Sequence, residues 1–225
     1  MCSHYQVIKD RERYLRAFGH YPPAHPYVED VWPERLGMFI RQPREADSGD
    51  EAVPARETIT GMFGLLPHWA KDTKLARSTF NARSETVHEK PSFRDAWKRS
   101  QHCIIPAEAI FEPDWRTGKA IATRITRADG EPMGIAGLWS WWRSPTGEQV
   151  HSMTMLTINA DDHEVMRNFH KPGDEKRMVV ILPEGSYDDW LTASVQRSRE
   201  FLRQYLAEAL TTEAGAALLE HAREN

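Results

Sequence analysis

The sequence predicts a mixed α+β fold with a β-rich middle, on three observations. Its 225 residues are enough to bury a substantial core in one large domain or two small ones. The middle of the chain is a series of short segments rich in β-branched and aromatic residues, separated by turn-forming residues. The tail, residues 196–223, is dominated by Ala, Leu, Glu and Arg, which predicts a helical C-terminal tail.

The N-terminal part predicts one helical segment followed by irregular chain. In residues 5–20, apolar side chains such as Tyr14 and Phe18 line one side of a helix. Residues 21–26 contain three prolines and cannot continue it. Residues 41–57 have few large apolar side chains and predict an exposed loop. No second core begins cleanly after that loop, so we expect a single domain over residues 1–225.

The middle of the chain alternates strand and helix signals. A helix is predicted at 90–100, where Pro91 lies in the first turn, and another at 161–169, capped by Asp161 or Asp162. A further helix is expected to open at Pro183. The predicted strands are 58–66, 101–105, 109–112, 119–126, 133–141, 151–159 and 178–182.

Composition excludes several classes of protein. Hydrophobic residues make up 40% of the chain without an apolar run near 18 residues, so no membrane span is expected. No leader pattern precedes a cleavage site, and two cysteines make no disulfide framework, which favours the cytoplasm. The net charge of -4 argues against a broad basic face for duplex DNA but leaves room for a local phosphate site.

No cofactor or metal is expected from the motifs. The ten histidines include no close pair of the His-Glu-x-x-His kind, and only one cysteine could join them. Neither a phosphate-binding glycine loop nor a Gly-x-Ser-x-Gly elbow is present. Cys103 itself lies in an apolar run that reads as a buried strand.

Cys2 directly follows the initiator methionine. Removal of Met1 would leave an amine and a thiol on adjacent carbons, which is a 1,2-aminothiol. The amine, with a pKa of about 8, condenses with an aldehyde to an imine, and the thiol then closes on the imine carbon to form a thiazolidine. Ring closure is intramolecular and benefits from a high effective molarity. Because residue 2 of a chain is usually a frayed terminus, its importance depends on the other candidate residues.

Four further places in the sequence carry side chains that are candidates for a functional site. Glu112 ends an apolar run, where partial burial would raise its pKa and suit it to proton transfer, although a strand-end glutamate can also face water. Residues 81–86 concentrate amide, guanidinium, hydroxyl and carboxylate groups, as surface loops also do. His170 precedes a turn, and lone histidines are more often structural than catalytic. Trp69 is a candidate exposed stacking platform.

Taken together, a set of short blocks in the chain resembles the SRAP family, the SOS-response-associated peptidases also known as abasic-site processing proteins. The blocks follow the family's order and span residues 2 to about 182, so the match is specific although each block is short. They are Met-Cys at the start, Gly-Leu-Leu-Pro-His-Trp-Ala at 64–70, Asn-Ala-Arg-Ser-Glu-Thr at 81–86, Cys-Ile-Ile-Pro-Ala at 103–107, Phe-Glu at 111–112, Ala-Gly-Leu-Trp at 136–139, Met-Leu-Thr at 155–157 and Arg-Met-Val-Val-Ile-Leu at 177–182.

The resemblance implies a fold and a function. The fold is a single α+β domain with a β-rich, largely antiparallel, barrel-like core flanked by helices. The function is a DNA-damage response in which mature Cys2 captures the aldehyde of an abasic site in single-stranded DNA as a thiazolidine, a covalent DNA-protein link. Peptidase-like release of Met1 and a lyase-like activity are also implied. We expect a cytoplasmic monomer that is nucleoid-associated when bound to DNA.

The resemblance also assigns roles to individual residues. Cys2 matches the nucleophile, Asn81 the residue that positions its amine and the sugar, and Glu112 the proton shuttle. Thr157 matches a threonine near the sugar, and Trp69 an aromatic that stacks on a base beside the lesion.

The resemblance also implies phosphate contacts for Arg83 and Arg177.

The chain departs from the family's pattern at other positions. The family's Cys-Gly-Arg start reads Cys-Ser-His, so histidine stands at position 4 where the family has a phosphate-binding arginine. The Tyr-Asn-x-Ala-Pro-Thr block is not recognisable between residues 21 and 42. The tryptophan that follows the family's catalytic glutamate is replaced by Pro113.

The catalytic histidine is the most important departure. In the family it lies two residues before the arginine matched by Arg177, and that position holds Glu175. If residues 171–174 form an extra turn, which Pro-Gly favours, His170 takes the histidine's place. We therefore expect His170 beside Glu112, with Glu175 turned away or paired with a cation.

Two other functions remain open from the residues alone. An N-terminal-nucleophile cysteine amidase or peptidase would use the same Cys2 thiol on an amide, with the α-amine as base. A diverged, inactive single-strand-binding module would explain the altered start and histidine region. An amidase should give no stable adduct when it is mixed with aldehyde-bearing DNA. Low reactivity of Cys2 together with retained single-strand binding would favour the inactive module.

Overall fold

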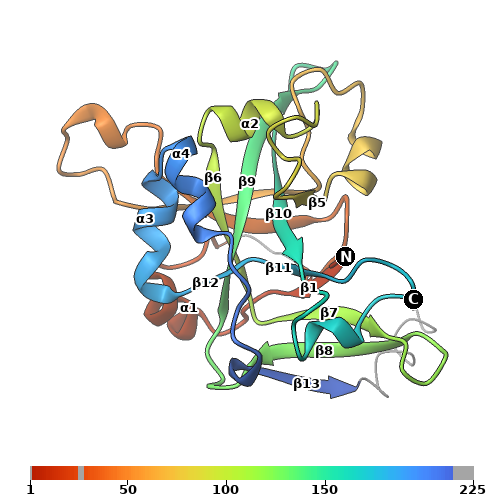
Figure 1. Cartoon of the computed structure of the whole chain (residues 1–225). Coiled ribbons are helices and arrows are strands. Elements are labelled where there is room, and N and C mark those ends of the chain that lie inside the picture. Colours follow the sequence, from red (N-terminus) through yellow and green to blue (C-terminus); the bar gives the residue numbers. More distant parts are fainter. Residues whose placement is uncertain (1, 25–27, 215–225) are drawn as a thin grey trace.

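Two β-sheets form the centre of the protein in the computed structural model, which describes residues 2–24 and 28–214 (Figure 1). The smaller, five-stranded sheet runs in the order β13-β8-β7-β1-β2, and all its pairings are antiparallel. Its strands are β1 (His4–Gln6), β2 (Asp30–Val31), β7 (Ala109–Asp114), β8 (Ile121–Arg127) and β13 (Leu210–Ala214). This sheet brings the N-terminal strand beside β7.

The larger sheet closes on itself. Strand β10 pairs with β4 on one side and with β9 on the other, so β10, β4, β3, β6 and β9 form a ring. Most pairings are antiparallel, but β10 runs parallel to β4 and β5. The mixed α+β fold with a largely antiparallel, barrel-like core is therefore confirmed. The strands are β3 (Leu36–Arg41), β4 (Glu57–Phe63), β5 (Asn81–Arg83), β6 (His102–Ala107), β9 (Met133–Arg143), β10 (Gln149–Asn159), β11 (Arg177–Val179) and β12 (Ile181–Leu182).

The helices are short and lie around the sheets (Figure 1). The first, α1 (Arg11–Phe18), begins where the Asp10 side chain accepts hydrogen bonds from two backbone N–H groups and ends at Gly19, whose φ is 80°. The others are α2 (Arg94–Lys98), α3 (Tyr187–Thr192) and α4 (Val195–Ser198). Short 3-10 turns occur at η1 (Ala46–Ser48), η2 (Thr73–Ser78), η3 (Met166–Asn168), η4 (Glu184–Ser186), η5 (Arg199–Phe201) and η6 (Ala207–Ala209).

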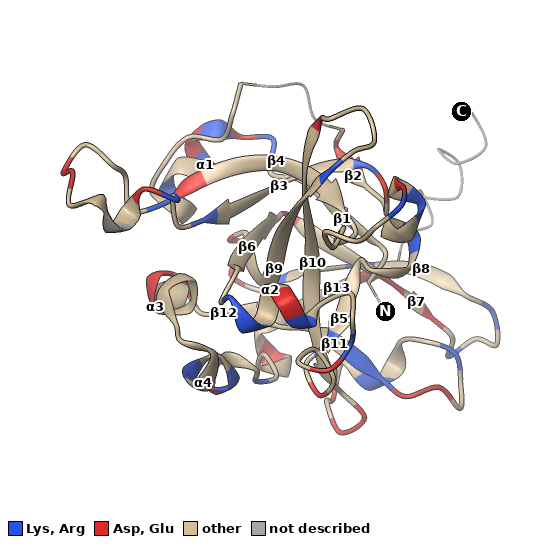
Figure 2. Ribbon diagram, turned by 90° about the horizontal axis from the view of Figure 1, so that it is seen from above, with Lys and Arg blue, Asp and Glu red and all other residues tan. Residues whose placement is uncertain are grey.

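One large apolar cluster fills the space inside and between these elements. It includes residues from both sheets, such as Tyr5 and Ile104, and Trp190 of α3, whose indole donates to the Cys103 carbonyl at 2.8 Å. Cys103 is fully buried, as its apolar run predicts. Charged residues of both signs are interspersed along helices and connecting loops, while the strands carry fewer (Figure 2).

Two predicted helices are wrong. Residues 161–169 form only the 3-10 turn η3, because local side chains take the backbone donors: the His163 ring accepts from the N–H groups of Val165 and Met166. In the tail, α4, η5 and η6 are followed by β13, which pairs with β8. Backbone pairing to an open sheet edge and burial of Leu210 override the helical propensity there; residues 215–223 lie outside the described part.

Smaller differences concern boundaries. The helix expected at 90–100 covers only α2. The strand expected at 178–182 divides at Val180, which accepts a hydrogen bond from Ala136 of β9 and donates one to Leu156 of β10, and so passes between two neighbours. The loop expected at 41–57 connects β3 and β4, with the end residues in those strands. Among the described residues no helix is long and apolar enough to cross a membrane.

Candidate active site between the two sheets

Cys2 is held in the interior rather than at a frayed end. Its side chain is 1% exposed and joins the main apolar cluster. Its carbonyl oxygen accepts a hydrogen bond of 2.7 Å from Nδ2 of Asn81, and its Sγ lies 3.4 Å from the carbonyl oxygen of His4. Burial and, to a smaller extent, the nearby Glu112 raise the pKa of the Cys2 thiol to about 12, so the resting group is a thiol.

Both sheets contribute to this position. Strand β1 pairs with β7 so that His4 lies opposite Phe111, the residue before Glu112. Strand β5 pairs with β10 so that Asn81 lies opposite Met155. The hydrogen bond from Asn81 to Cys2 therefore joins the larger sheet to the N-terminal strand of the smaller one.

Glu112 and His170 form the titratable centre of the site. The glutamate is 2% exposed, and burial raises its pKa to about 7. Its Oε2 lies 3.3 Å from Nδ1 of His170. Nε2 of His170 donates to the carbonyl oxygen of Arg177 at 3.0 Å, which assigns the proton of the neutral ring to Nε2 and leaves Nδ1 as an acceptor facing the carboxyl group.

The two pKa shifts decide the charge state of this contact. Burial lowers the pKa of His170 to about 4, so the ring is neutral near neutral pH. Although the 3.3 Å contact has the geometry of an ion pair, we regard it as a contact of a neutral imidazole with a carboxyl group that ionises near pH 7. Glu112 can therefore both give and accept a proton under physiological conditions.

The expected extra turn is present between His170 and Glu175. The N–H of Asp174 donates to the carbonyl of Lys171 at 3.1 Å, and Gly173 has a φ of 88°. His170 has a φ of 64°, which is uncommon for a residue with a side chain, and such backbone conformations cluster at functional sites. This conformation, with a 3.0 Å hydrogen bond from the His170 N–H to Pro113, directs the ring to Glu112.

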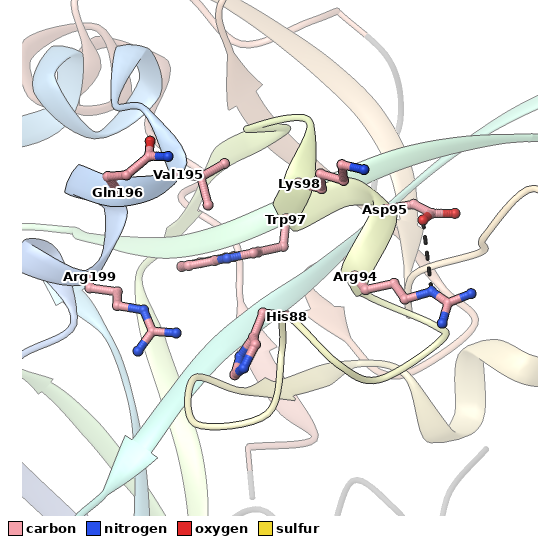
Figure 3. A pocket seen from close by; sticks show the side chains of 8 residues that line it. All are labelled: His88, Arg94, Asp95, Trp97, Lys98, Val195, Gln196 and Arg199. Atoms are coloured by element: carbon pink, nitrogen blue, oxygen red, sulfur yellow. Dashed lines mark ion pairs between the residues drawn. The ribbon is translucent and has the colours of Figure 1, made fainter.

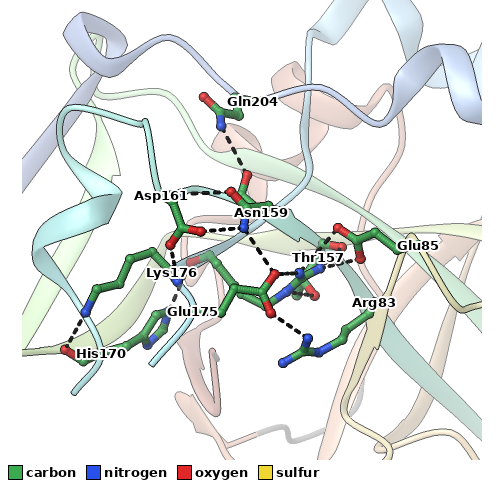
Figure 4. A network of polar contacts seen from close by, with 10 residues as sticks. Arg83, Glu85, Thr157, Asn159, Asp161, His170, Glu175, Lys176 and Gln204 are labelled. Atoms are coloured by element: carbon green, nitrogen blue, oxygen red, sulfur yellow. Dashed lines mark hydrogen bonds and ion pairs between the residues drawn. The ribbon is translucent and has the colours of Figure 1, made fainter. Parts of the chain in front are cut away.

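Glu175 pairs with cations, as expected: it binds both arginines predicted to hold phosphates (Figure 4). One carboxylate oxygen lies 2.6 Å from Arg83 and the other 2.6 Å from Arg177. Arg177 is 2% exposed and also donates to Glu85 at 2.8 Å and to the carbonyl oxygen of Thr157 at 2.8 Å. In this arrangement any phosphate that approached these arginines would have to compete with Glu175 for both guanidinium groups.

An open cavity adjoins this network. Its volume is about 550 Å³, and its lining includes Arg83, Trp115, His170 and Glu175. Thr157, by contrast, is 1% exposed and serves Arg177 with both its hydroxyl and its carbonyl oxygen. The cavity thus connects solvent with His170, whereas Thr157 is bound to Arg177 and does not line the cavity.

The remaining predicted residue, Trp69, lies in the loop after β4 and is 45% exposed. The loop is fastened by Trp142, whose indole donates to the Ala70 carbonyl at 2.7 Å. A second exposed indole was missed by the sequence reasoning: Trp32, just after β2, stacks on His4. The only sequence signal for it was the exchange of the family's arginine for histidine at position 4.

Another cavity lies elsewhere, between α2 and α4 (Figure 3). It has a volume of about 650 Å³ and is lined by Trp97, Arg94, Lys98 and Arg199, among others. None of the predicted site residues lines it. Over the part of the chain that the structure describes, no group of three or more His, Cys, Asp or Glu side chains is arranged to hold a metal ion.

Comparison with known proteins places the chain in a family. The profile of the SOS response associated peptidase (SRAP) family matches residues 1–218. The chain belongs to the SRAP family. A protein of Bordetella bronchiseptica with a solved structure is 51% identical and superimposes with a TM-score of 0.85, covering 95% of this chain and 99% of that one. A protein of Bacteroides thetaiotaomicron shares the fold, with a TM-score of 0.79 at 19% identity over 100% of this chain and 95% of its own.

Curated relatives of this SRAP chain carry a common name. Abasic site processing protein YoqW of Bacillus subtilis (strain 168) is 36% identical over 132 residues, which cover 57% of the chain and 54% of the relative. Abasic site processing protein HMCES of Rattus norvegicus is 26% identical over 228 residues, which cover 87% of the chain and 58% of the relative. The SRAP chain thus spans little more than half the length of these relatives.

Proposed function

We propose that this protein processes abasic sites: it binds single-stranded DNA that bears an abasic deoxyribose and captures the sugar aldehyde through Cys2 once Met1 has been removed. The names of its curated SRAP relatives support the substrate class. The observation that carries the chemistry is the buried group of Cys2, Asn81, Glu112 and His170, in which a carboxyl group ionising near pH 7 faces a neutral imidazole close to an N-terminal cysteine.

The first chemical step is formation of an imine. The free α-amine of Cys2 attacks the aldehyde carbon of the ring-opened sugar, a C–N bond forms, and the oxygen leaves as water. The amine nitrogen loses two protons and the leaving oxygen gains two; Glu112 in its acid form donates one to the oxygen and regains one from the nitrogen, while Nδ1 of the neutral His170 faces this carboxyl group. Asn81, which donates to the Cys2 carbonyl, fixes the backbone that carries the amine.

The second step closes the thiazolidine ring. Sγ of Cys2 adds to the imine carbon, and its proton passes to the nitrogen, so the sequence as a whole loses one water and involves no oxidation. Because burial holds the thiol in its protonated form, the proton has to be removed as the C–S bond forms, and ionised Glu112 can accept it. Reversal uses the same groups in the opposite direction. An imine that has not yet closed also accounts for lyase-like strand cleavage.

Release of Met1 is the companion activity we propose. In this hydrolysis water adds to the Met1 carbonyl, the Met1–Cys2 bond breaks, and the leaving nitrogen, which becomes the α-amine of Cys2, takes up a proton. Glu112, whose charge acts on the Cys2 thiol, is the proton donor that we propose. The protein would thus prepare its own nucleophile, a peptidase-like step. Intact mass after expression should show loss of one methionine in the wild type and its retention in Glu112→Ala.

The deciding experiment compares wild type with Cys2→Ala and Cys2→Ser on single-stranded DNA that carries one abasic site. We expect a heat-stable adduct only with the wild type, because the variants lack the thiol and stop at a hydrolysable imine. Borohydride trapping should capture that imine in Cys2→Ser. Durable adducts in both variants would rule out the thiazolidine.

The same assay tests the alternatives. A cysteine amidase would give no stable adduct with abasic DNA but would cleave amide substrates. An inactive binding module would retain single-strand affinity with an unreactive Cys2. Either pattern in the wild type would contradict the proposed function.

A further inference from the structure

Three aromatic rings form a column that leads from β7 to the surface beside Cys2. The ring of Trp32 lies 4.2 Å from that of His4, with planes inclined by 10°. His4 in turn lies 4.1 Å from Phe111, with planes inclined by 11°. Phe111 and His4 are buried at 5% and 6% exposure, whereas Trp32 is 49% exposed. We call these three rings the ring column.

Trp32, the outermost ring of the column, is about half exposed. One face of the Trp32 indole is covered by His4, so the exposed half of the residue belongs to its other face and edges. Parallel rings at this separation are the geometry in which flat aromatic groups stack. A further flat ring would extend the column by one layer without any rearrangement of the side chains below it.

The charges around the ring column favour a neutral ring over a phosphate. Nε2 of His4 lies 2.6 Å from a carboxylate oxygen of Asp30, which fixes the orientation of the imidazole. Burial lowers the pKa of His4 despite this carboxylate, so the imidazole is neutral at pH 7. Asp30 is 41% exposed at its side chain and repels phosphate. Where an arginine at position 4 would attract a phosphate, this chain presents an aromatic surface.

The ring column is also adjacent to the reactive centre. His4 lies two residues after Cys2, a separation of about 7 Å in extended chain. Phe111 directly precedes Glu112 on β7. Trp32 lies one ring further out than His4, so a base that stacks on it belongs to a nucleotide that flanks a sugar held at Cys2 and not to the sugar itself.

We propose that Trp32 is a base-stacking subsite: an unpaired base flanking the abasic site lies on its outer face and continues the ring column. This subsite rests on the proposed function for its ligand, single-stranded DNA. It differs from the surface at Trp69, which lies in another loop, after β4. Stacking of a base on an exposed indole is tolerant of sequence and contributes affinity rather than base specificity.

The test measures binding without covalent capture. Oligonucleotides carry a tetrahydrofuran residue, which has no aldehyde, and a fluorescent 2-aminopurine at one flanking position in turn. We expect quenching of 2-aminopurine by the wild type at one flank, and loss of that quenching with Trp32→Ala together with about tenfold weaker binding. Trp32→Phe should restore most of the affinity, because a smaller flat ring still stacks.

Tyr21→Ala is the matched control. Tyr21 is also 49% exposed and aromatic, but its hydroxyl donates to Glu12 of α1 and it stacks on no ring of the column. Its variant should bind as the wild type does. Equal affinity of Trp32→Ala and wild type, unchanged fluorescence at every flank, or absence of any binding by the wild type would each overturn the subsite. Normal stacking without adduct formation on true abasic DNA would instead refute the function of Cys2 and leave the subsite intact.

Discussion

Replacement of Glu112 by glutamine should slow the reaction and stabilise the fold at the same time. Burial raises the pKa of this carboxyl group from 4.5 to about 7, so the folded protein binds more protons than the unfolded chain between these values. Stability contributed by the neutral carboxyl is therefore full below pH 4.5 and is lost as the pH rises towards 7. Above pH 7 the wild type carries a buried charge that Glu112→Gln does not.

The magnitude follows from the same pKa difference. A pKa of about 7 for Glu112 in the folded protein, against 4.5 in the unfolded chain, means that ionisation of this residue lowers the free energy of unfolding by about 3 kcal/mol at pH 8. For a chain of this size, that is an increase in Tm of about 6 to 12 °C for Glu112→Gln at pH 8. At pH 4 the ionisation-linked difference vanishes, because the carboxyl is neutral in both the folded and the unfolded wild type.

The assay combines thermal unfolding at pH 4 and pH 8 with adduct kinetics between pH 5 and pH 9. The wild-type rate should change with a midpoint near pH 7, and Glu112→Gln should lose that midpoint and be slower by about 10²- to 10⁴-fold. Glu148→Gln, on the exposed turn between β9 and β10, should change neither quantity. A stability difference that is the same at both pH values would refute the buried ionisation of Glu112.

Two further predictions concern the residues around this centre. Asn81→Ala should slow adduct formation about 10- to 100-fold and lower the free energy of unfolding by about 1 to 3 kcal/mol, because it leaves the buried Cys2 carbonyl without its donor; adduct kinetics and urea unfolding measure both, and an unchanged rate would contradict a positioning role. Glu175→Gln should bind ordinary single-stranded DNA about fivefold more tightly, with a steeper salt dependence, because the arginines lose an internal competitor; fluorescence anisotropy at several salt concentrations measures this. The control is Asp174→Asn, which also removes one negative charge from the lining of this cavity but breaks no arginine contact among those described. An equal gain in DNA affinity for this variant would mean that net charge, and not competition for the arginines, causes the effect.

Local sequence patterns were sufficient to predict strands wherever the chain buries a face of the sheet. The predicted strands of the middle, such as 133–141 and 151–159, correspond to β9 and β10, because alternating and continuous apolar runs match the pleat of a buried sheet. The capacity of Cys2 to become a 1,2-aminothiol on removal of Met1 is also visible in the sequence, since it is a property of covalent structure. The turn at 171–174 followed from its Pro-Gly pair.

Only the tertiary structure decided the rest, because contacts between distant segments have no local signature. Residues 210–214 of the tail become strand β13 because β8 offers an open edge and Leu210 is buried there, neither of which the composition of the tail reveals. Pairing of β1 with β7 brings Phe111 against His4, and pairing of β1 with β2 places the exposed Trp32 beside the same imidazole. The carboxylate of Glu175 lies on two arginines that the sequence assigned to phosphate, because folding places β5 and β11 on either side of β10 and brings opposite charges together there.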